Sequence, residues 1–192
     1  MAEDDKNDEQ KDDAGPKAGE LFFKSRTVLI TGEINDKLAA KVTTQLIALA
    51  EDSDDPINVF ISSPGGHVES GDMVHDMIKF IKPVVRCIGS GWVASAGALI
   101  FVGAAKENRF CLPNTRFLLH EPRGGIGGSA TDMKIQAEQI RIMRERFHRI
   151  FAEATGQTQK KIAEDTERDF WLNTDEAIEY GLLGKVISSA SE

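Results

Sequence analysis

The sequence predicts an α/β fold with a mostly parallel sheet, flanking helices and one long helix that protrudes from the body. Two observations predict it. Apolar, β-branched runs alternate with segments whose apolar residues recur at helical spacing, and one helical segment is far longer than the others. The 192 residues, 41% of them hydrophobic, are enough for one globular domain with its own core.

The first half of the chain predicts a strand, helix, strand unit. Residues 26–31 and 57–62 are rich in β-branched and other apolar residues and are predicted strands. Residues 36–50 between them place four apolar side chains on one helical face: Leu38, Val42, Leu46 and Leu49. A helix that connects two strands of one sheet makes them parallel, because it returns the chain to the same edge.

A second unit of the same kind follows. Residues 69–81 are predicted to be a helix that directs Met73, Met77 and Phe80 inward. Residues 84–88 are predicted to be the next strand. The sheet is therefore expected to be mostly parallel.

The segment after residue 90 is unusual for its small residues. Residues 94–105 are predicted to be a small-residue helix, and residues 116–120 a strand. Residues 124–128 include four glycines, which is too many for a buried strand. We expect an edge strand or mobile loop there, which the backbone of a ligand could approach.

The longest predicted element is a helix at residues 131–155, which Gly156 ends. At 1.5 Å per residue it is about 37 Å long. Five apolar residues form a stripe along it: Ile140, Met143, Phe147, Ile150 and Phe151. A single small domain cannot cover such a helix, so we expect its far end to pack on another subunit.

The composition excludes several classes of function. No apolar run reaches the roughly 18 residues of a membrane-spanning helix, and the acidic N-terminus is not a signal peptide, so we expect a cytoplasmic protein without a membrane partner. A net charge of −8 argues against nucleic-acid binding. Cys87 and Cys111 lie in apolar stretches without metal-ligand spacing, and we expect no metal and no cofactor.

Residues 1–20 carry much of the negative charge, with eight acidic residues against three lysines. A stretch with so few apolar side chains cannot offset the entropy lost on ordering. We therefore predict a disordered acidic tail at residues 1–20, followed by one domain at residues 21–192. A solvated tail without a specific role is favoured over an arm that binds a partner.

Ser95 lies where residues 89–98, nearly all small, run from a strand into a helix. At such a turn the positive end of the helix dipole and unpaired backbone N–H groups can stabilise an oxyanion, as a nucleophilic serine requires. Close packing of a small-residue helix against a neighbouring helix is an equally good interpretation of this segment alone.

A second glycine turn, at residues 62–66, also joins a strand to a helix. Gly66 can present a bare N–H to the same oxygen and a β-edge to a peptide. Simple strand-to-helix punctuation is the alternative. The turn falls at the same end of the parallel sheet as Ser95, where open α/β sheets place their sites, and this favours a function.

His120 is the best candidate for a base, because it ends an apolar strand at the carboxyl end of the sheet. A histidine held by core hydrogen bonds is the alternative. The other histidines are predicted to lie on the surface: His67, His75 and His148. The orienting acid has three candidates among which spacing does not choose: Asp165, Glu167 and Asp169.

Five motifs in this chain resemble those of the ClpP peptidases in order and spacing. They lie at residues 61–66, 93–98, 109–114, 119–122 and 165–169, within a likeness that covers roughly residues 21–188. The resemblance implies a ClpP/crotonase-like fold. It also implies a serine endopeptidase, the proteolytic subunit of a self-compartmentalised, ATP-dependent protease that degrades unfolded or ATPase-delivered polypeptides.

The resemblance implies roles for individual residues as well. Ser95 would be the nucleophile, His120 the base and Asp169 the third member of the triad. The N–H groups of Gly66 and Ala96 would form the oxyanion hole. The substrate-binding positions would be Gly66, His67, Val68, Arg123, Gly124, Gly125 and Ile126.

For the assembly, the resemblance implies a homo-oligomer of two stacked seven-membered rings, with an AAA+ ATPase unfoldase as a possible partner. The helix at residues 131–155 resembles the handle that joins the rings. Arg168 matches a family arginine that pairs with an acid across the contact between rings, here Asp132.

The departures from the family pattern concern the cleft and the gate. Ala96 follows the nucleophile where methionine is usual, and Glu121 and Arg123 replace glutamine and leucine, so we expect a more polar cleft. The hydrophobic N-terminal segment that forms the axial gate is replaced by the acidic tail. Of two aromatic positions that help to dock an ATPase, one is Phe60 and the other is Asn58.

A serine endopeptidase is the leading hypothesis. The altered cleft and gate leave a weakly active or non-catalytic structural ring paralogue as the alternative, although all three triad residues are present. An acyl-CoA enzyme of the crotonase group would also use a paired-amide oxyanion hole, but Ser95, His120 and Asp169 have no purpose there.

Overall fold

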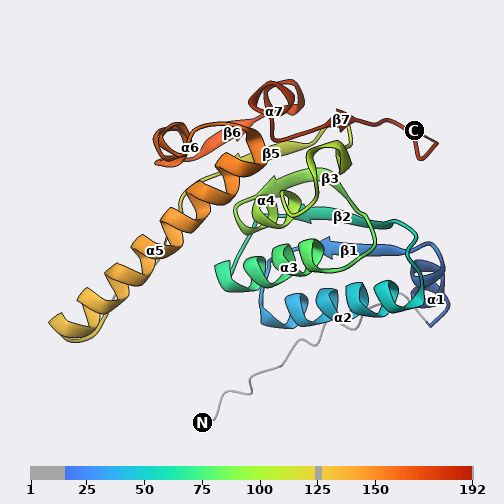
Figure 1. Cartoon of the computed structure of the whole chain (residues 1–192), viewed down its shortest axis with the longest axis horizontal. Coiled ribbons are helices and arrows are strands. Elements are labelled where there is room, and N and C mark those ends of the chain that lie inside the picture. Colours follow the sequence, from blue (N-terminus) through green and yellow to red (C-terminus); the bar gives the residue numbers. More distant parts are fainter. Residues whose placement is uncertain (1–15, 124–126, 192) are drawn as a thin grey trace, which may run out of the picture.

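The computed structural model describes residues 16–123 and 127–191. The helices are α1 (Pro16–Lys24), α2 (Asp36–Asp52), α3 (Val68–Phe80), α4 (Ala96–Phe101), α5 (Ala130–Thr155), α6 (Gln159–Thr166) and α7 (Thr174–Tyr180), with the short 3-10 helix η1 (Lys106–Asn108) (Figure 1). The strands are β1 (Thr27–Thr31), β2 (Ile57–Ser63), β3 (Val85–Ala94), β4 (Arg109–Cys111), β5 (Arg116–Leu119), β6 (Phe170–Leu172) and β7 (Lys185–Val186).

In this described part of the chain, the strands form one sheet in which β1, β2, β3, β4 and β7 lie side by side and parallel. Besides β2, β3 pairs with two further strands: its residues 87–89 pair with β4 and its residues 92–94 pair with β5. β6 runs antiparallel to β5. The prediction of a mostly parallel sheet is confirmed, and the carboxyl ends of β2, β3 and β5 meet at one edge.

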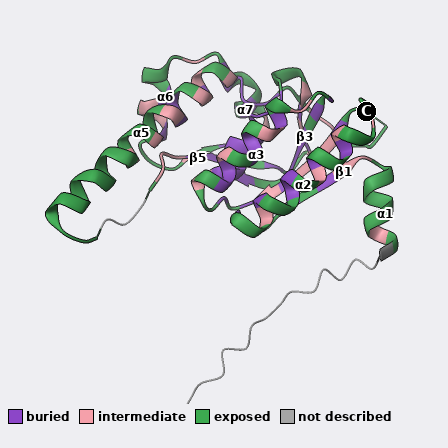
Figure 2. Ribbon diagram, turned by 60° about the horizontal axis from the view of Figure 1, so that its bottom comes forward, coloured by how far each residue is buried: buried purple, intermediate pink, exposed green. Residues whose placement is uncertain are grey.

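Helices α2, α3 and α4 lie together on one face of the sheet, and the buried residues concentrate between these helices and the strands (Figure 2). On α2 the predicted face is confirmed, since Val42, Leu46 and Leu49 are fully buried. Asn35 caps this helix by accepting a hydrogen bond from the N–H of Leu38.

The predicted inward face of α3 is wrong for Met73 and Phe80, whereas Met77 is partly buried and packs against the core. Met73 is 47% exposed and Phe80 is 84% exposed, whereas Gly71, Val74 and Ile78 are buried. The reason is close packing between helices, because a Cβ on Gly71 would lie only 3.1 Å from the Cβ of Ala96 on α4. Gly71, Val74 and Ile78 therefore face inward, whereas Met73 and Phe80 face solvent in the isolated chain.

Two predicted boundaries also differ from the structure. β3 extends to residue 94, because its last residues pair with β5, so the helix predicted at residues 94–105 shortens to α4. Residues 16–20, predicted to belong to the disordered tail, lie in α1 instead. The rest of the predicted tail, residues 1–15, lies outside the described residues.

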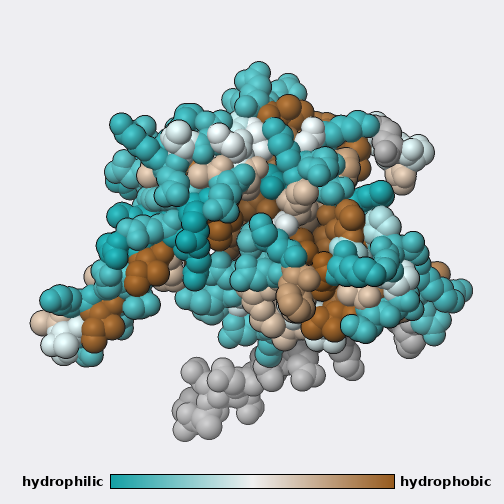
Figure 3. Space-filling model, viewed as in Figure 1, coloured by the Kyte–Doolittle hydropathy of each residue, from teal (hydrophilic) through white to brown (hydrophobic). Residues whose placement is uncertain are grey.

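Helix α5 protrudes from the body, as predicted (Figure 1). Ser129 caps its start, and Gly156, with a φ of 78°, ends it in the left-handed conformation that favours glycine. Phe147 and Phe151 are buried near the body, while every residue from 130 to 139 is exposed. Figure 3 shows apolar side chains on this protruding part. Ile135, in this part of α5, is 57% exposed.

Candidate active site

Ser95 lies at a strained turn between β3 and α4. Its φ of 54° and ψ of −120° are unusual for a residue with a side chain; Arg26 is the other non-glycine residue in the described ranges with a positive φ. The N–H of Ser95 donates to the carbonyl oxygen of Leu118 at 2.9 Å, which ties the turn to β5. A sharp strand-to-helix turn of this kind exposes a nucleophilic serine.

The glycine turn after β2 packs directly against Ser95. A Cβ on Gly65 would lie 2.6 Å from the Cβ of Ser95 and 3.1 Å from the backbone nitrogen of Ala96. Gly66 has a φ of 148°, and a Cβ there would lie 2.1 Å from the carbonyl oxygen of Ile34. Among the described residues, the N–H groups of Gly66 and Ala96 have no backbone acceptor, so both can donate to a bound oxygen.

Ser95 and His120 line one small cavity of about 20 Å³. Its other walls are Val68, Ala96, Leu99, Pro122 and Phe147. The sequence did not identify Leu99, Pro122 or Phe147 as part of this site. Phe147 belongs to the apolar stripe that was recognised on α5, but the stripe does not reveal which end of the sheet it covers.

The β5–β6 ladder brings His120 and Asp169 to the same place. Leu119 pairs with Phe170 in this antiparallel ladder, so the next residues outward, His120 and Asp169, lie opposite each other. Their side chains, however, are bonded elsewhere. His120 Nδ1 lies 2.9 Å from the carbonyl oxygen of Glu121. In the described ranges, no hydrogen bond joins Ser95, His120 and Asp169 to one another.

The partner of Asp169 is Arg123, whose guanidinium donates to Asp169 Oδ1 at 2.7 Å. Both side chains are about half exposed. No hydrogen bond joins the other two candidate acids to His120 within the described residues: Asp165 accepts a hydrogen bond from the Tyr180 hydroxyl at 2.7 Å, and Glu167 is the exposed C-cap of α6. Burial, together with the Asp165 carboxylate, raises the pKa of Tyr180.

The predicted substrate-binding residues partly converge. A pocket of about 200 Å³ next to the Ser95 cavity is lined by Gly66, His67, Val68, Glu69, Pro122, Arg123, Ile140 and Met143. Val68 and Pro122 also line the cavity at Ser95, so the two spaces are adjacent. The remaining predicted positions, residues 124–126, lie outside the described residues.

His67 is half exposed, as predicted, and sits among acidic side chains at the rim of this pocket. Its Nε2 lies 3.1 Å from Glu69, and its Nδ1 lies 3.1 Å from Asp36. The hydroxyl of Ser70 also donates to Asp36, and this hydrogen bond, with the nearby charge of His67, lowers the pKa of Asp36.

His148, predicted to lie on the surface, is buried instead. Its Nε2 lies 2.8 Å from the carboxylate of Glu121, the residue that follows His120. The surface position was predicted because His148 is flanked by arginines in the sequence. The pairing with Glu121 lets a polar side chain point inward, and it links α5 to the strand end that carries His120.

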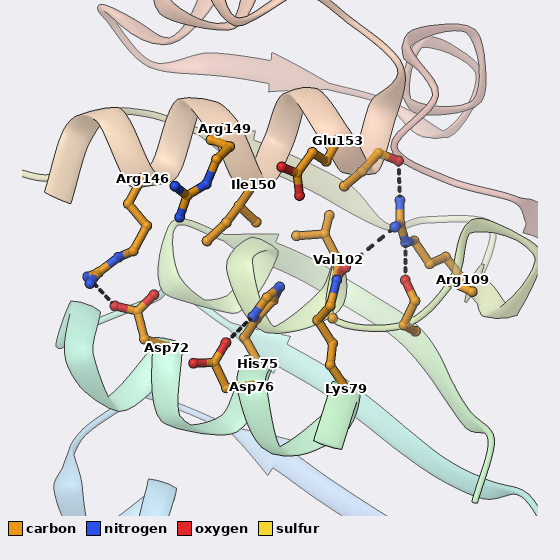
Figure 4. A pocket seen from close by; sticks show the side chains of 14 residues that line it. Asp72, His75, Asp76, Lys79, Val102, Arg109, Arg146, Arg149, Ile150 and Glu153 are labelled. Atoms are coloured by element: carbon orange, nitrogen blue, oxygen red, sulfur yellow. Dashed lines mark hydrogen bonds and ion pairs between the residues drawn. The ribbon is translucent and has the colours of Figure 1, made fainter. Parts of the chain in front are cut away.

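His75 is also buried rather than exposed, at the wall of a larger cavity of about 540 Å³ between α3 and α5 (Figure 4). Its Nδ1 lies 2.9 Å from Asp76, and its Nε2 has no hydrogen-bond partner within the described residues. Asp72 and Arg146 pair across the same cavity, where burial raises the pKa of Asp72. The predicted catalytic residues do not line this cavity.

Asp132 has a role within its own chain. Its carboxylate accepts hydrogen bonds from the N–H and hydroxyl of Ser129, which completes a capping box at the start of α5 and lowers the pKa of Asp132. Arg168 is exposed in the segment between α6 and β6. A pair between Arg168 and Asp132 of different subunits stays a prediction.

In residues 16–123 and 127–191, no group of three or more histidine, cysteine or acidic side chains could hold a metal ion. No helix there is long and apolar enough to cross a membrane. Cys87 and Cys111 are buried and free, and burial raises the pKa of the Cys87 thiol to about 12.

Known proteins share both this sequence and this fold. The family model described as Clp protease matches residues 10–190. The chain belongs to the Clp protease family. A Clp protease proteolytic subunit of Paracoccus denitrificans is 70% identical over 165 residues, which are 86% of this chain and 83% of that protein. Proteolytic subunit 3 of Rhizobium meliloti is 57% identical over the full length of both chains.

The fold is that of the Clp proteolytic subunits. The structure of ClpP1 from Listeria monocytogenes matches with a TM-score of 0.82 at 51% identity, over 90% of this chain and 97% of that chain. The α/β architecture with its protruding α5 is therefore the ClpP fold. This chain is a serine-type peptidase.

Proposed function

We propose that this chain is the proteolytic subunit of a ring-shaped protease and that it cuts unfolded polypeptides with Ser95, His120 and Asp169. The observation that supports this best is the strained turn at Ser95, which shares one cavity with His120. A non-catalytic ring subunit would have no use for that strain, which costs free energy in the folded state.

In the proposed reaction, His120 accepts the proton of Ser95 while the serine oxygen attacks the peptide carbonyl. The N–H groups of Gly66 and Ala96 donate to the oxyanion that forms. His120 then gives its proton to the leaving amine, and a water molecule hydrolyses the acyl-enzyme by the same route. Asp169 fixes the imidazole tautomer and stabilises the imidazolium.

This mechanism requires two exchanges of hydrogen bonds. Asp169 must leave Arg123, and His120 Nδ1 must leave the carbonyl oxygen of Glu121. The position of Asp169 opposite His120 in the β5–β6 ladder supports this, because side-chain rotation without a change of strand register can bring the two together. The isolated chain is thus a resting arrangement of the proposed triad.

We further infer that the subunit works as two stacked seven-membered rings in the cytoplasm and receives substrates from an AAA+ ATPase. The exposed N-terminal part of α5 supports contact with a second ring. Asn58 and Phe60 line a groove of about 500 Å³ on the open face of the sheet, with Ile88 and Phe110. An apolar groove of this kind supports docking of a partner segment.

The proposal is tested by replacing Ser95 with alanine. Ser95→Ala should lower hydrolysis of a fluorogenic peptide by on the order of 10⁴-fold, as removal of a triad member generally does. Ser90→Ala, a change of the same type on β3, serves as the control and should keep full activity. A fluorophosphonate should label Ser95 in the wild type; labelling of a different serine would refute the assignment.

A further inference from the structure

The side chain of Arg123 makes an ion pair and also lines a pocket. Its guanidinium holds Asp169, the proposed acid of the triad, at 2.7 Å. The same side chain lines the pocket of about 200 Å³ that adjoins the cavity at Ser95. Arg123 therefore connects the proposed catalytic acid with the proposed substrate-binding space.

Arg123 is the only lysine or arginine among the residues that line this pocket, all of them described. Two charged or titratable side chains share the lining, and they pair with each other, since His67 Nε2 lies 3.1 Å from Glu69. Asp36 reaches His67 rather than Arg123. The opposite wall is apolar and includes Ile140 and Met143 from α5. The pocket thus offers an apolar wall and one permanent cation beside the His67–Glu69 pair.

We propose that Arg123 selects substrates with an acidic side chain next to the cleaved bond, and that it releases Asp169 to His120 when that side chain binds. The inference rests on the proposed function. The substrate carboxylate takes the place of the Asp169 carboxylate on the guanidinium. The number of ion pairs stays the same, and Asp169 becomes free to accept a hydrogen bond from His120 Nδ1.

The exchange is favourable for three reasons. Arg123 and Asp169 are each about half exposed, and ion pairs between exposed side chains contribute little to stability. Asp169 already lies opposite His120 in the β5–β6 ladder. His120 exchanges a neutral acceptor, the carbonyl oxygen of Glu121, for a carboxylate, and charge-assisted hydrogen bonds are the stronger kind.

The test uses the assembled full-length protein and fluorogenic peptides with either glutamate or glutamine at each of the three residues before the cleaved bond. The two side chains have nearly the same shape, so a difference in kcat/KM reports the charge. For the wild type we expect at least one position where glutamate raises kcat/KM by about tenfold or more, the usual size of a hydrogen bond to a charged group.

Arg123→Met keeps the apolar stem of the side chain and removes its charge. We expect this variant to lose the preference for glutamate, so that its kcat/KM becomes about equal for the glutamate and glutamine peptides. Arg141→Met is the matched control, since Arg141 is also a half-exposed arginine paired with carboxylates, and it is not among the residues that line the pocket. It should keep the wild-type preference.

Equal kcat/KM for glutamate and glutamine peptides in the wild type would overturn the inference, and so would an unchanged preference in Arg123→Met. The wild-type comparison stands even where the variant fails to fold. Labelling of Ser95 by a fluorophosphonate separates the two claims: label on Ser95 without a preference refutes the selection by Arg123 alone, whereas label on another serine refutes the proposed function.

Discussion

At Ser95 the backbone is held in a conformation that a side chain disfavours. Such a positive φ costs about 1–3 kcal/mol, and the surrounding structure must maintain it. Here the carbonyl oxygen of Leu118 accepts the N–H of Ser95, and Gly65 leaves room for the serine side chain. The orientation of the proposed nucleophile therefore depends on a neighbouring residue that itself carries no functional group.

Gly65→Ala should consequently damage activity more than it damages folding. The new Cβ would press on the Cβ of Ser95, and a displaced nucleophile commonly costs about 100-fold in rate. Gly32→Ala is the control, because Gly32 also has a positive φ, of 76°, but nothing lies within 4 Å of its Cβ position. Equal losses of kcat/KM in the two variants would show that strain alone, rather than contact with Ser95, is responsible.

Replacing each of the two buried histidines with leucine should affect the free energy of unfolding differently. His75→Leu removes a buried nitrogen that has no partner in the described part of the chain, so the free energy of unfolding should stay within about 1 kcal/mol or rise. His148→Leu leaves the Glu121 carboxylate without its closest partner and should cost about 1–3 kcal/mol. Urea denaturation of both variants measures this; similar losses would contradict it.

Sequence alone could place Ser95 and His120 because each follows a strand and so reaches the carboxyl edge of the sheet. It could not predict the ion pair between Arg123 and Asp169, which are 46 residues apart in the sequence. Arg123 lies in a loop and Asp169 just before a short strand, and neither segment has a periodic pattern that would predict the contact. The burial of His148 was missed for a similar reason, since its partner Glu121 lies on another element.

At the scale of elements, one buried side chain fastens the ends of several segments. Arg109 on β4 is 4% exposed, and its guanidinium donates to the carbonyl oxygens of Ala104 and Ala154 at 2.8 Å and, at longer range, to those of Val102 and Leu182. Burial lowers its pKa to about 10, so it remains charged at neutral pH. The carbonyl groups of Val102 and Ala104 lie just after α4, that of Ala154 lies in the last turn of α5, and that of Leu182 lies just after α7.

Arg109→Met should therefore destabilise the fold by about 3 kcal/mol or more, because several buried carbonyl groups lose their donor together. Arg109→Lys should not restore stability, since an ammonium cannot reach acceptors spread over a planar fork. Arg86→Met, at an exposed position on β3, is the control and should change little. Thermal denaturation of the three variants provides the measurement; a stable Arg109→Met would contradict this role.

Elements with a long periodic pattern were predictable, and short ones were not. The face of α2 and the extent of α5 followed from apolar spacing over four or more turns. β4, β6 and β7, with three, three and two residues, are too short to show any alternation. The boundary between β3 and α4 was misplaced because pairing with β5, a contact distant in sequence, extends the strand.

At the scale of the molecule, α5 governs how copies of the chain can meet. With 26 residues it is about 39 Å long, and its first ten residues touch little of the body. The exposed side chains there include Met133 and Ile135. Apolar groups on an isolated helix favour burial against another copy, in agreement with the proposed contact between rings.

The predicted pair between Arg168 and Asp132 can be separated from the capping role of Asp132. Arg168→Ala and Asp132→Asn should each shift double rings towards single rings in sedimentation velocity, because each removes one charge of the pair. Ser129→Ala breaks the capping box but leaves both charges, so it should preserve double rings. A dissociated Ser129→Ala protein would instead assign the effect to the cap.

In the proposed assembly, the exposed N-terminal part of α5 would also affect the lifetime of a subunit that has not yet joined a ring. An extended stretch of helix that packs on nothing opens locally at little cost in free energy, and opened segments are where other proteases cut. Subunits in the proposed rings would bury this stretch, whereas surplus subunits would leave it exposed. Turnover would then remove the unassembled copies selectively and keep the supply of subunits matched to the number of complete rings.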